Sequence, residues 1–122
     1  MIIAVPVTDG VLSTHFGRCE RFALVEVNEA ERSIVAITEE VPPPHEPGVL
    51  PAWLHERGAE VVIAGGMGQR AHQLFARDGI RVVVGAPSDT PENVVSAYLA
   101  GTLESGPDAC DQPHREANRA DR

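Results

Sequence analysis

The fold of this chain is decided by residues 60–85, which read EVVIAGGMGQRAHQLFARDGIRVVVG. Aliphatic, β-branched runs at 60–64 and 81–85 predict two strands. Between them, apolar residues three and four positions apart predict an amphipathic helix over 69–78, and Gly79 ends it. A strand, a helix and a strand in this order predict two parallel strands joined by a crossover helix.

The chain before this stretch is predicted to form an antiparallel meander. An apolar first strand covers 2–7 and is followed by a turn at 8–10. Residues 21–27 and 33–38 alternate around the polar segment 28–32 and therefore predict a hairpin. The first half of the chain thus supplies strands that pair antiparallel.

Two helices and two irregular segments complete the predicted chain. Segment 41–48 holds four prolines, so it is stiff, extended and unable to enter a sheet. A short helix follows at 49–57, and a last one is announced by a capping threonine and a proline and spans 90–101. We expect one domain over 1–103 and a polar, mobile tail over 104–122.

These elements predict an α/β domain with a mixed five-stranded sheet, an antiparallel meander plus parallel strands, flanked by three helices. Their order, β-β-β-α-β-α-β-α, is typical of a ribonuclease H-like fold. That fold often supports nucleases, which hold two metal ions between acids at adjacent strand ends. Here the strand at 60–64 runs into Gly65 and Gly66, and Asp9 stands alone after the first strand. Because no cluster of acids is expected at adjacent strand ends, the sequence argues against a nuclease.

Composition narrows the classes of function further. The 122-residue chain has a net charge of -8, and all ten of its cationic side chains are arginines, with no basic patch. Nucleic acids and anionic membranes attract clustered cations, so neither is expected as a partner. No apolar stretch is long enough to span a membrane, and no leader pattern is present, so we expect a cytoplasmic protein. Cys19 and Cys110 are expected as free thiols or ligands, and a single bridge between them remains open.

Soft metal ligands follow the first strand and occupy the proline-rich loop. Residues 13–19 read STHFGRC, which places His15, Arg18 and Cys19 close together. If a helical turn forms here, His15 and Cys19 face one object, and Arg18 would lower the thiol pKa. Imidazole and thiolate suit iron, copper and molybdenum–sulfur species, and His45 on the stiff loop is the best single candidate. The alternative is a turn that buries an inert cysteine.

The glycine-rich segment Gly65-Gly66-Met67-Gly68 joins a strand to a helix. Its backbone N–H groups and the helix dipole favour an anion, and Arg70 would add a positive charge. The motif has neither the spacing of a dinucleotide fingerprint nor the lysine of a P-loop. The alternative is a tight turn without a ligand, with Met67 in the core or lining a pocket.

The remaining histidines and the tail cysteine separate into two groups. Cys110 and His114 are predicted as further ligands from the tail, although they are too sparse for a folded zinc motif. His55 and His72 lie on the polar faces of their helices and are predicted to be surface residues.

Five short motifs in one order carry a resemblance to a known family. They are IAVPV at 3–7, HFGR at 15–18, His45, VIAGGMGQRA at 62–71 and GI at 79–80. Together they resemble the dinitrogenase iron-molybdenum cofactor biosynthesis family over roughly residues 1–103. The resemblance implies an anionic metal–sulfur cluster as ligand, of the Fe/Mo/S or Mo/Cu/S type. It implies such a ligand more firmly than it implies a part in nitrogen fixation.

From residues and resemblance together, we predict a non-catalytic carrier that exchanges its cluster with donor and acceptor proteins. It is expected as a monomer or weak homodimer, because an edge strand and an unexplained Trp53 leave room for a second copy. One alternative is an adaptor that binds a protein partner without metal, and another is an enzyme with Cys19 as nucleophile. The predicted cluster contacts are Phe16, Gly17, Arg18, Gly65, Gly66, Met67, Gly68 and Arg70. The predicted metal ligands are His15, Cys19, His45, Cys110 and His114.

Overall fold

The computed structural model of the chain describes residues 1–13, 19–43 and 48–101. In chain order the elements are β1 (Ile2–Thr8), β2 (Val11–Leu12), β3 (Arg21–Asn28), β4 (Ser33–Glu40), α1 (Val49–Glu56), β5 (Ala59–Ile63), α2 (Gln69–Arg77), β6 (Arg81–Val83) and α3 (Pro91–Ala100). Each predicted helix and strand is present, with bounds that differ by no more than two residues. The predicted domain boundary at 103 and the tail over 104–122 lie outside the described residues.

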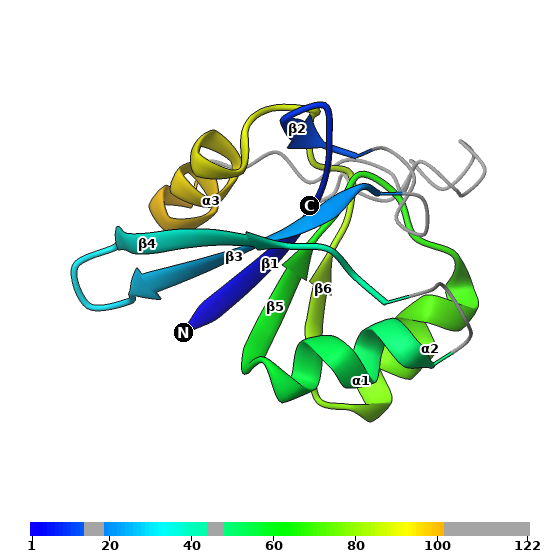
Figure 1. Cartoon of the computed structure of the whole chain (residues 1–122). Helices are drawn as coiled ribbons and strands as arrows, with labels where there is room; N and C mark the ends of the chain where they lie inside the picture. Colours follow the sequence, from blue (N-terminus) through cyan, green and yellow to red (C-terminus); the bar gives the residue numbers. More distant parts are fainter. Residues whose placement is uncertain (14–18, 44–47, 102–122) are drawn as a thin grey trace, which may run out of the picture.

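A mixed sheet forms the centre of the molecule, in the order β4-β3-β1-β5-β6. The β1–β3 and β3–β4 pairs are antiparallel, which confirms the meander, and the β1–β5 and β5–β6 pairs are parallel, which confirms the crossover unit. Figure 1 shows the strands fanning out from one twisted sheet. The predicted α/β class with a mixed sheet is therefore confirmed.

The sheet has six strands, so the expected number of five was wrong. The additional strand is β2, which pairs with the end of β1 through Val7–Leu12 and Thr8–Val11. Asp9 and Gly10 both have positive φ, 56° and 83°, as a two-residue hairpin turn requires. The turn was predicted, but a two-residue strand is too short to leave a periodic signal in the sequence.

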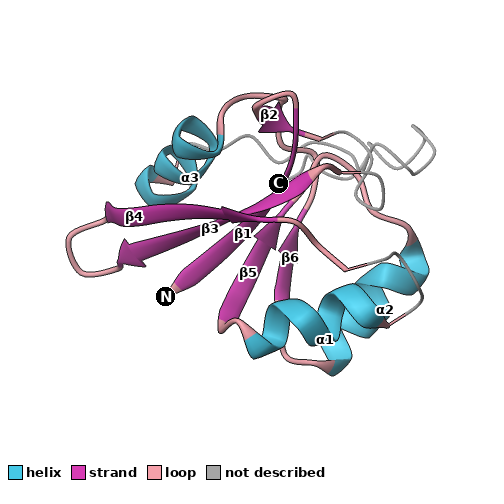
Figure 2. Cartoon of the chain, in the orientation of Figure 1, coloured by secondary structure: helices cyan, strands magenta, loops and turns pink. Residues whose placement is uncertain are grey.

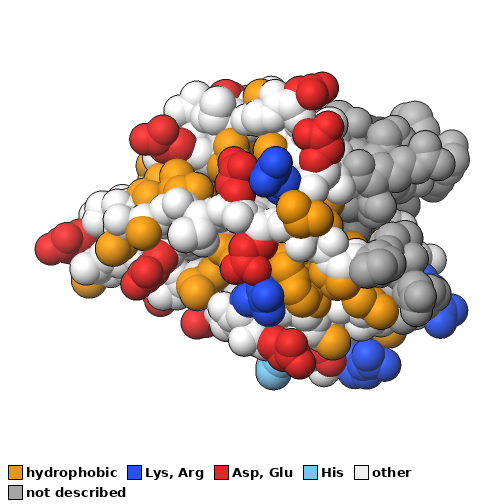
Figure 3. Space-filling view, in the orientation of Figure 1, with side chains coloured by type: hydrophobic (Ala, Val, Ile, Leu, Met, Phe, Trp, Pro, Cys, Tyr) orange, Lys and Arg blue, Asp and Glu red, His pale blue; other side chains and the backbone are white. Residues whose placement is uncertain are grey.

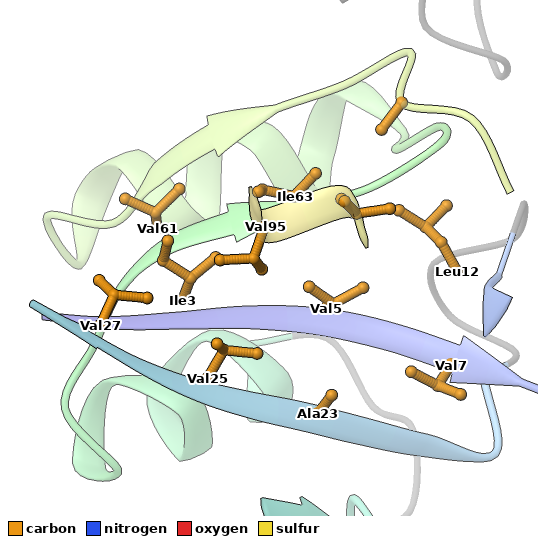
Figure 4. Close-up of a cluster of buried hydrophobic side chains, with 12 residues drawn as sticks. Ile3, Val5, Val7, Leu12, Ala23, Val25, Val27, Val61, Ile63 and Val95 are labelled. Carbon is orange, nitrogen blue, oxygen red and sulfur yellow. The ribbon is translucent and has the colours of Figure 1, made fainter. Parts of the chain in front are cut away.

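Two hydrophobic cores lie on the two faces of the sheet. Along β1, alternate side chains enter different cores, with Ile3, Val5 and Val7 on one face and Ala4 on the other. The first core is completed by side chains of α3, and Figure 4 shows it with Val95 over β1 and β5. The second is completed by α1 and α2, which lie on the opposite side of the sheet from α3 in Figure 2. Among the described residues, no helix is both long and apolar enough to cross a membrane.

Trp53 has its packing partners within the chain. Its ring lies 5.8 Å from that of Phe22 between centroids, and the guanidinium carbon of Arg57 is 4.5 Å from the Trp53 centroid. Arg57 Nε in turn contacts Glu40 Oε1 at 2.8 Å. Contacts within the chain therefore account for Trp53, and this side chain gives no support of its own for a dimer.

Candidate functional site

One end of the sheet gathers the segments that carried the predicted site. β1 and β5 are parallel, so both end there, and the antiparallel β3 begins there. The backbone N–H of Glu20 donates to the Val7 carbonyl at 2.9 Å, which fixes the residues just before β3 to the end of β1. Glu40 pairs with Phe22, so the chain leaves β4 at this same end, where residues 41–43 follow. Tertiary structure therefore brings the described residues that flank three candidate segments to the same end of the sheet (Figure 1).

From this end of the sheet, the connections that follow β1 and β5 run to opposite sides. After β1 it turns through β2 toward β3, whereas after β5 it continues through α2 to β6 on the other side. In open α/β sheets, ligands bind outside the carboxyl ends of strands where successive connections diverge in this way. The adjacent ends of β1 and β5 form such a point.

Cys19 lies at this edge, half-buried against the core that faces α1 and α2. Burial raises the pKa of its thiol to about 11, although backbone hydrogen bonds from Cys19 and Val7 act in the lowering direction. The expectation that this pKa would be lowered was therefore wrong. Loss of hydration around the sulfur outweighs the favourable contacts, so the free thiol is neutral at pH 7.

Alkylation of Cys19 should report this raised pKa directly. In a Cys110→Ser variant, which leaves Cys19 as the only cysteine, we expect the iodoacetamide rate at pH 7 to be about 100-fold below that of an ordinary thiol. The rate should rise with pH, with a midpoint at the thiol pKa of about 11. Mass spectrometry follows the reaction, and the same variant unfolded in urea is the control. A folded-state midpoint at or below 8.5 would contradict the expectation.

The glycine-rich segment after β5 is held between the strands and α2. The Gly65 carbonyl accepts from the N–H of Gly85 at 3.0 Å, and the Ala64 N–H donates to Val83 at 2.8 Å. Gly65 and Gly66 are buried, and Met67, 1% exposed, belongs to the core that faces α1 and α2. Met67 is thus a core residue, one of the two positions predicted for it.

Gly68 is different, because the fold does not explain its lack of a side chain. Its φ of -66° and ψ of 157° are open to every residue type, and an added Cβ would meet nothing within 4 Å. Gly68 caps α2 without a side-chain hydrogen bond, and no acid lies in the first turn of that helix. Instead the first turn carries the exposed Arg70, which is unfavourable next to the positive end of the helix dipole.

The start of α3 shows what an ordinary helix end looks like in this chain. There the Thr90 hydroxyl accepts from the Asn93 N–H at 3.2 Å, Pro91 takes the first helical position, and Glu92 complements the dipole. The start of α2 has none of these features. It presents backbone donors, open space and a cation, a combination that suits an external anion.

Several predicted site residues lie outside the described part of the chain. These are His15, Phe16, Gly17, Arg18, His45, Cys110 and His114. Within residues 1–13, 19–43 and 48–101, no three His, Cys, Asp or Glu side chains come together as a metal site. His55 is exposed as predicted, whereas His72 is half-buried.

Thr8 is a candidate that the sequence analysis did not identify, because the pattern predicts it only as part of the turn at 8–10. It is the last residue of β1, and its Oγ1 atom is buried without a hydrogen-bond partner. The available signal was a hydroxyl at the end of an otherwise aliphatic strand.

The sequence is similar to known proteins over most of its length. A family model described as dinitrogenase iron-molybdenum cofactor matches residues 1–101. The uncharacterized protein MJ0580 of Methanocaldococcus jannaschii is 33% identical over 107 residues, which cover 85% of this chain and 90% of that protein.

Solved structures of similar sequence share the fold of this chain. The crystal structure of PH0822 superposes with a TM-score of 0.80 at 30% identity, covering 89% of this chain and 99% of that one. The apo form of the orange protein from Desulfovibrio gigas superposes with a TM-score of 0.69 at 25% identity, covering 86% and 92%. The likeness extends over nearly all of the described fold.

Proposed function

The chain belongs to the dinitrogenase iron-molybdenum cofactor family, and on that premise we propose that it is a non-catalytic carrier of an anionic metal–sulfur cluster. The cluster, of the Fe/Mo/S or Mo/Cu/S type, is cargo that the protein receives and passes on. Family membership and the likeness to the orange protein support a role linked to metal clusters.

The observation that carries the proposal is the bare start of α2. A glycine that the fold does not require leaves open space over backbone N–H groups, and Arg70 stands beside them. Two unfavourable features, a missing cap and a cation at the positive helix end, become favourable once an anion occupies the space. A cluster bearing sulfide and negative charge is such an anion.

The proposed donor set suits a soft metal cluster, and Cys19 is its member within the described residues. Cys19 supplies a thiol that becomes a thiolate ligand when a metal displaces its proton. His15 and His45 are proposed as imidazole ligands, and Cys110 and His114 as ligands from the tail. Phe16, Gly17, Arg18, Gly65 and Gly66 complete the proposed contacts.

The charge of the protein limits how tightly it holds such cargo. Acidic side chains are spread over the face shown in Figure 3, and the net charge is -8. Attraction from Arg70 and backbone donors therefore acts at short range, against repulsion from the rest of the molecule. Modest affinity suits a carrier that must release its cluster to an acceptor protein. We propose exchange with donor and acceptor proteins in the cytoplasm.

Reconstitution tests the proposal. The untagged protein, purified without oxygen, is mixed with tetrathiomolybdate and Cu(I), then desalted for its visible spectrum and metal content per chain. We expect colour and stoichiometric metal in the wild type, and loss of both in Cys19→Ser and His45→Ala. His55→Ala, an exposed histidine in the last turn of α1, is the matched control and should bind normally.

A wild-type protein that stays colourless and metal-free, also with an iron–sulfur precursor, would overturn the carrier function. The adaptor that binds a protein partner without metal would then be the better reading. Uptake that survives both ligand substitutions would show that the cluster is held elsewhere.

A further inference from the structure

The hydroxyl of Thr8 is a buried donor that the fold leaves unused. Its Oγ1 atom has no hydrogen-bond partner, and burying an unpaired hydroxyl costs free energy that a valine of similar shape would avoid. The rest of β1 is apolar, with the sequence IIAVPVT. Packing therefore gives no reason for a hydroxyl at this position.

The position of Thr8 in β1 determines the face of the sheet toward which its side chain points. Ile3, Val5 and Val7 enter the core under α3, whereas Ala4 enters the core that faces α1 and α2. Side chains alternate along a strand, so Thr8 lies on the face of Ala4. Cys19 packs on that same core, and the backbone of the neighbouring Val7 hydrogen-bonds to its sulfur.

The glycine-rich segment also leaves the sheet on this face. β3 pairs with one side of β1 as far as Val7, so β2 must pair with Val7 and Thr8 on the other side. That is the side on which β5 pairs with the beginning of β1. The chain after β5 therefore cannot continue beside Thr8 and must turn out of the sheet. Met67 belongs to the core facing α1 and α2, so the turn is toward the side to which Thr8 points.

We propose that the Thr8 hydroxyl is a binding group of this site and donates a hydrogen bond to an anionic sulfur or oxygen atom of the cargo. Three features share this face and this end of the sheet: an unused donor, the Cys19 sulfur and the segment leading to α2. Thr8 as a whole is half-buried, and a rotation of about 120° about its Cα–Cβ bond moves the hydroxyl to another of the three staggered positions. One such rotation turns the donor toward a ligand. The inference rests on the proposed carrier function.

Substitutions of Thr8 test it with tetrathiomolybdate and Cu(I) as the probe. We expect Thr8→Val to weaken binding about tenfold in a spectroscopic titration, as loss of one hydrogen bond to a charged group predicts. Its melting temperature should equal or exceed that of the wild type, because the unpaired hydroxyl is gone. Thr8→Ser keeps the donor and should bind within about threefold. Thr38→Val, at an exposed threonine of β4, is the control for the exchange itself.

The outcomes separate this inference from the carrier function. Wild-type protein that binds nothing overturns both. Wild-type binding that Thr8→Val leaves unchanged overturns the inference alone. A lower melting temperature in both Thr8→Val and Thr8→Ser would show that Thr8 serves the fold, which also overturns it. Weak binding by Thr8→Val, normal binding by Thr8→Ser and undiminished stability in both support it.

Discussion

Arg70→Glu is expected to weaken the uptake of tetrathiomolybdate with Cu(I) by more than tenfold, while Arg77→Glu leaves it within about twofold. Both arginines are exposed on α2, and each reversal changes the net charge by the same amount from -8. They lie seven positions apart along the helix, about 10 Å, which is near the screening length at physiological salt. An anion at the start of α2 therefore feels the charge of Arg70 much more strongly than that of Arg77.

Stability should change in the opposite sense to binding. An acid at the start of a helix complements the dipole, so Arg70→Glu should keep or raise the melting temperature. Arg77→Glu places an acid in the last turn and should lower it slightly. Loss of uptake in Arg70→Glu would then not be a consequence of unfolding. Equal effects of the two reversals on uptake would show that net charge, and not the start of α2, controls binding.

Phe22→Ala should lower the free energy of unfolding by about 3–5 kcal/mol, the range for truncating a buried phenylalanine. Phe22 is 0% exposed, and its ring contacts Trp53 with centroids 5.8 Å apart. Since small domains have about 5–15 kcal/mol of stability in total, the variant should be close to unfolding. Phe22 also lies three residues after Cys19, so its loss loosens the start of β3 at the candidate site.

Urea denaturation followed by circular dichroism measures this change, with fluorescence of the single tryptophan as a second probe. Phe22→Leu keeps most of the apolar volume and should cost about 1.5 kcal/mol or less. Val35→Ala, at a side chain that is 61% exposed on β4, is the surface control and should cost about 0.5 kcal/mol or less. A loss below about 1.5 kcal/mol in Phe22→Ala would mean that the Phe22–Trp53 contact is not part of the rigid core.

The long elements of the fold followed from local patterns. Alternation and β-branched runs located the hairpin and the parallel strands, because a buried strand needs apolar side chains along its length. Capping at Thr90 and the left-handed Gly101 bounded α3 from sequence, since those residues satisfy helix ends through local contacts. β2 was not predicted, because its two residues form a strand only through their pairing with β1.

The candidate site was less accessible to sequence reasoning. The glycine-rich segment and Arg70 could be identified, because strand–glycine–helix is a local arrangement. The raised pKa of Cys19 could not, since it depends on how much water the surrounding core removes from the sulfur. Arg57 over Trp53 and the unpaired Thr8 hydroxyl also went unpredicted, because each depends on residues distant along the chain.

The sequence by itself determined the types of element, their order, and which segments carry soft ligands, glycines and positive charge, because these depend on neighbouring residues. Only the tertiary structure decided that the segment before β3, the end of β1 and the glycine-rich segment after β5 lie at the same end of the sheet. It also decided that Gly68 opens onto empty space while Met67 is buried. Burial, desolvation and unpaired donors arise when distant segments pack together, and no local pattern of residues encodes that environment.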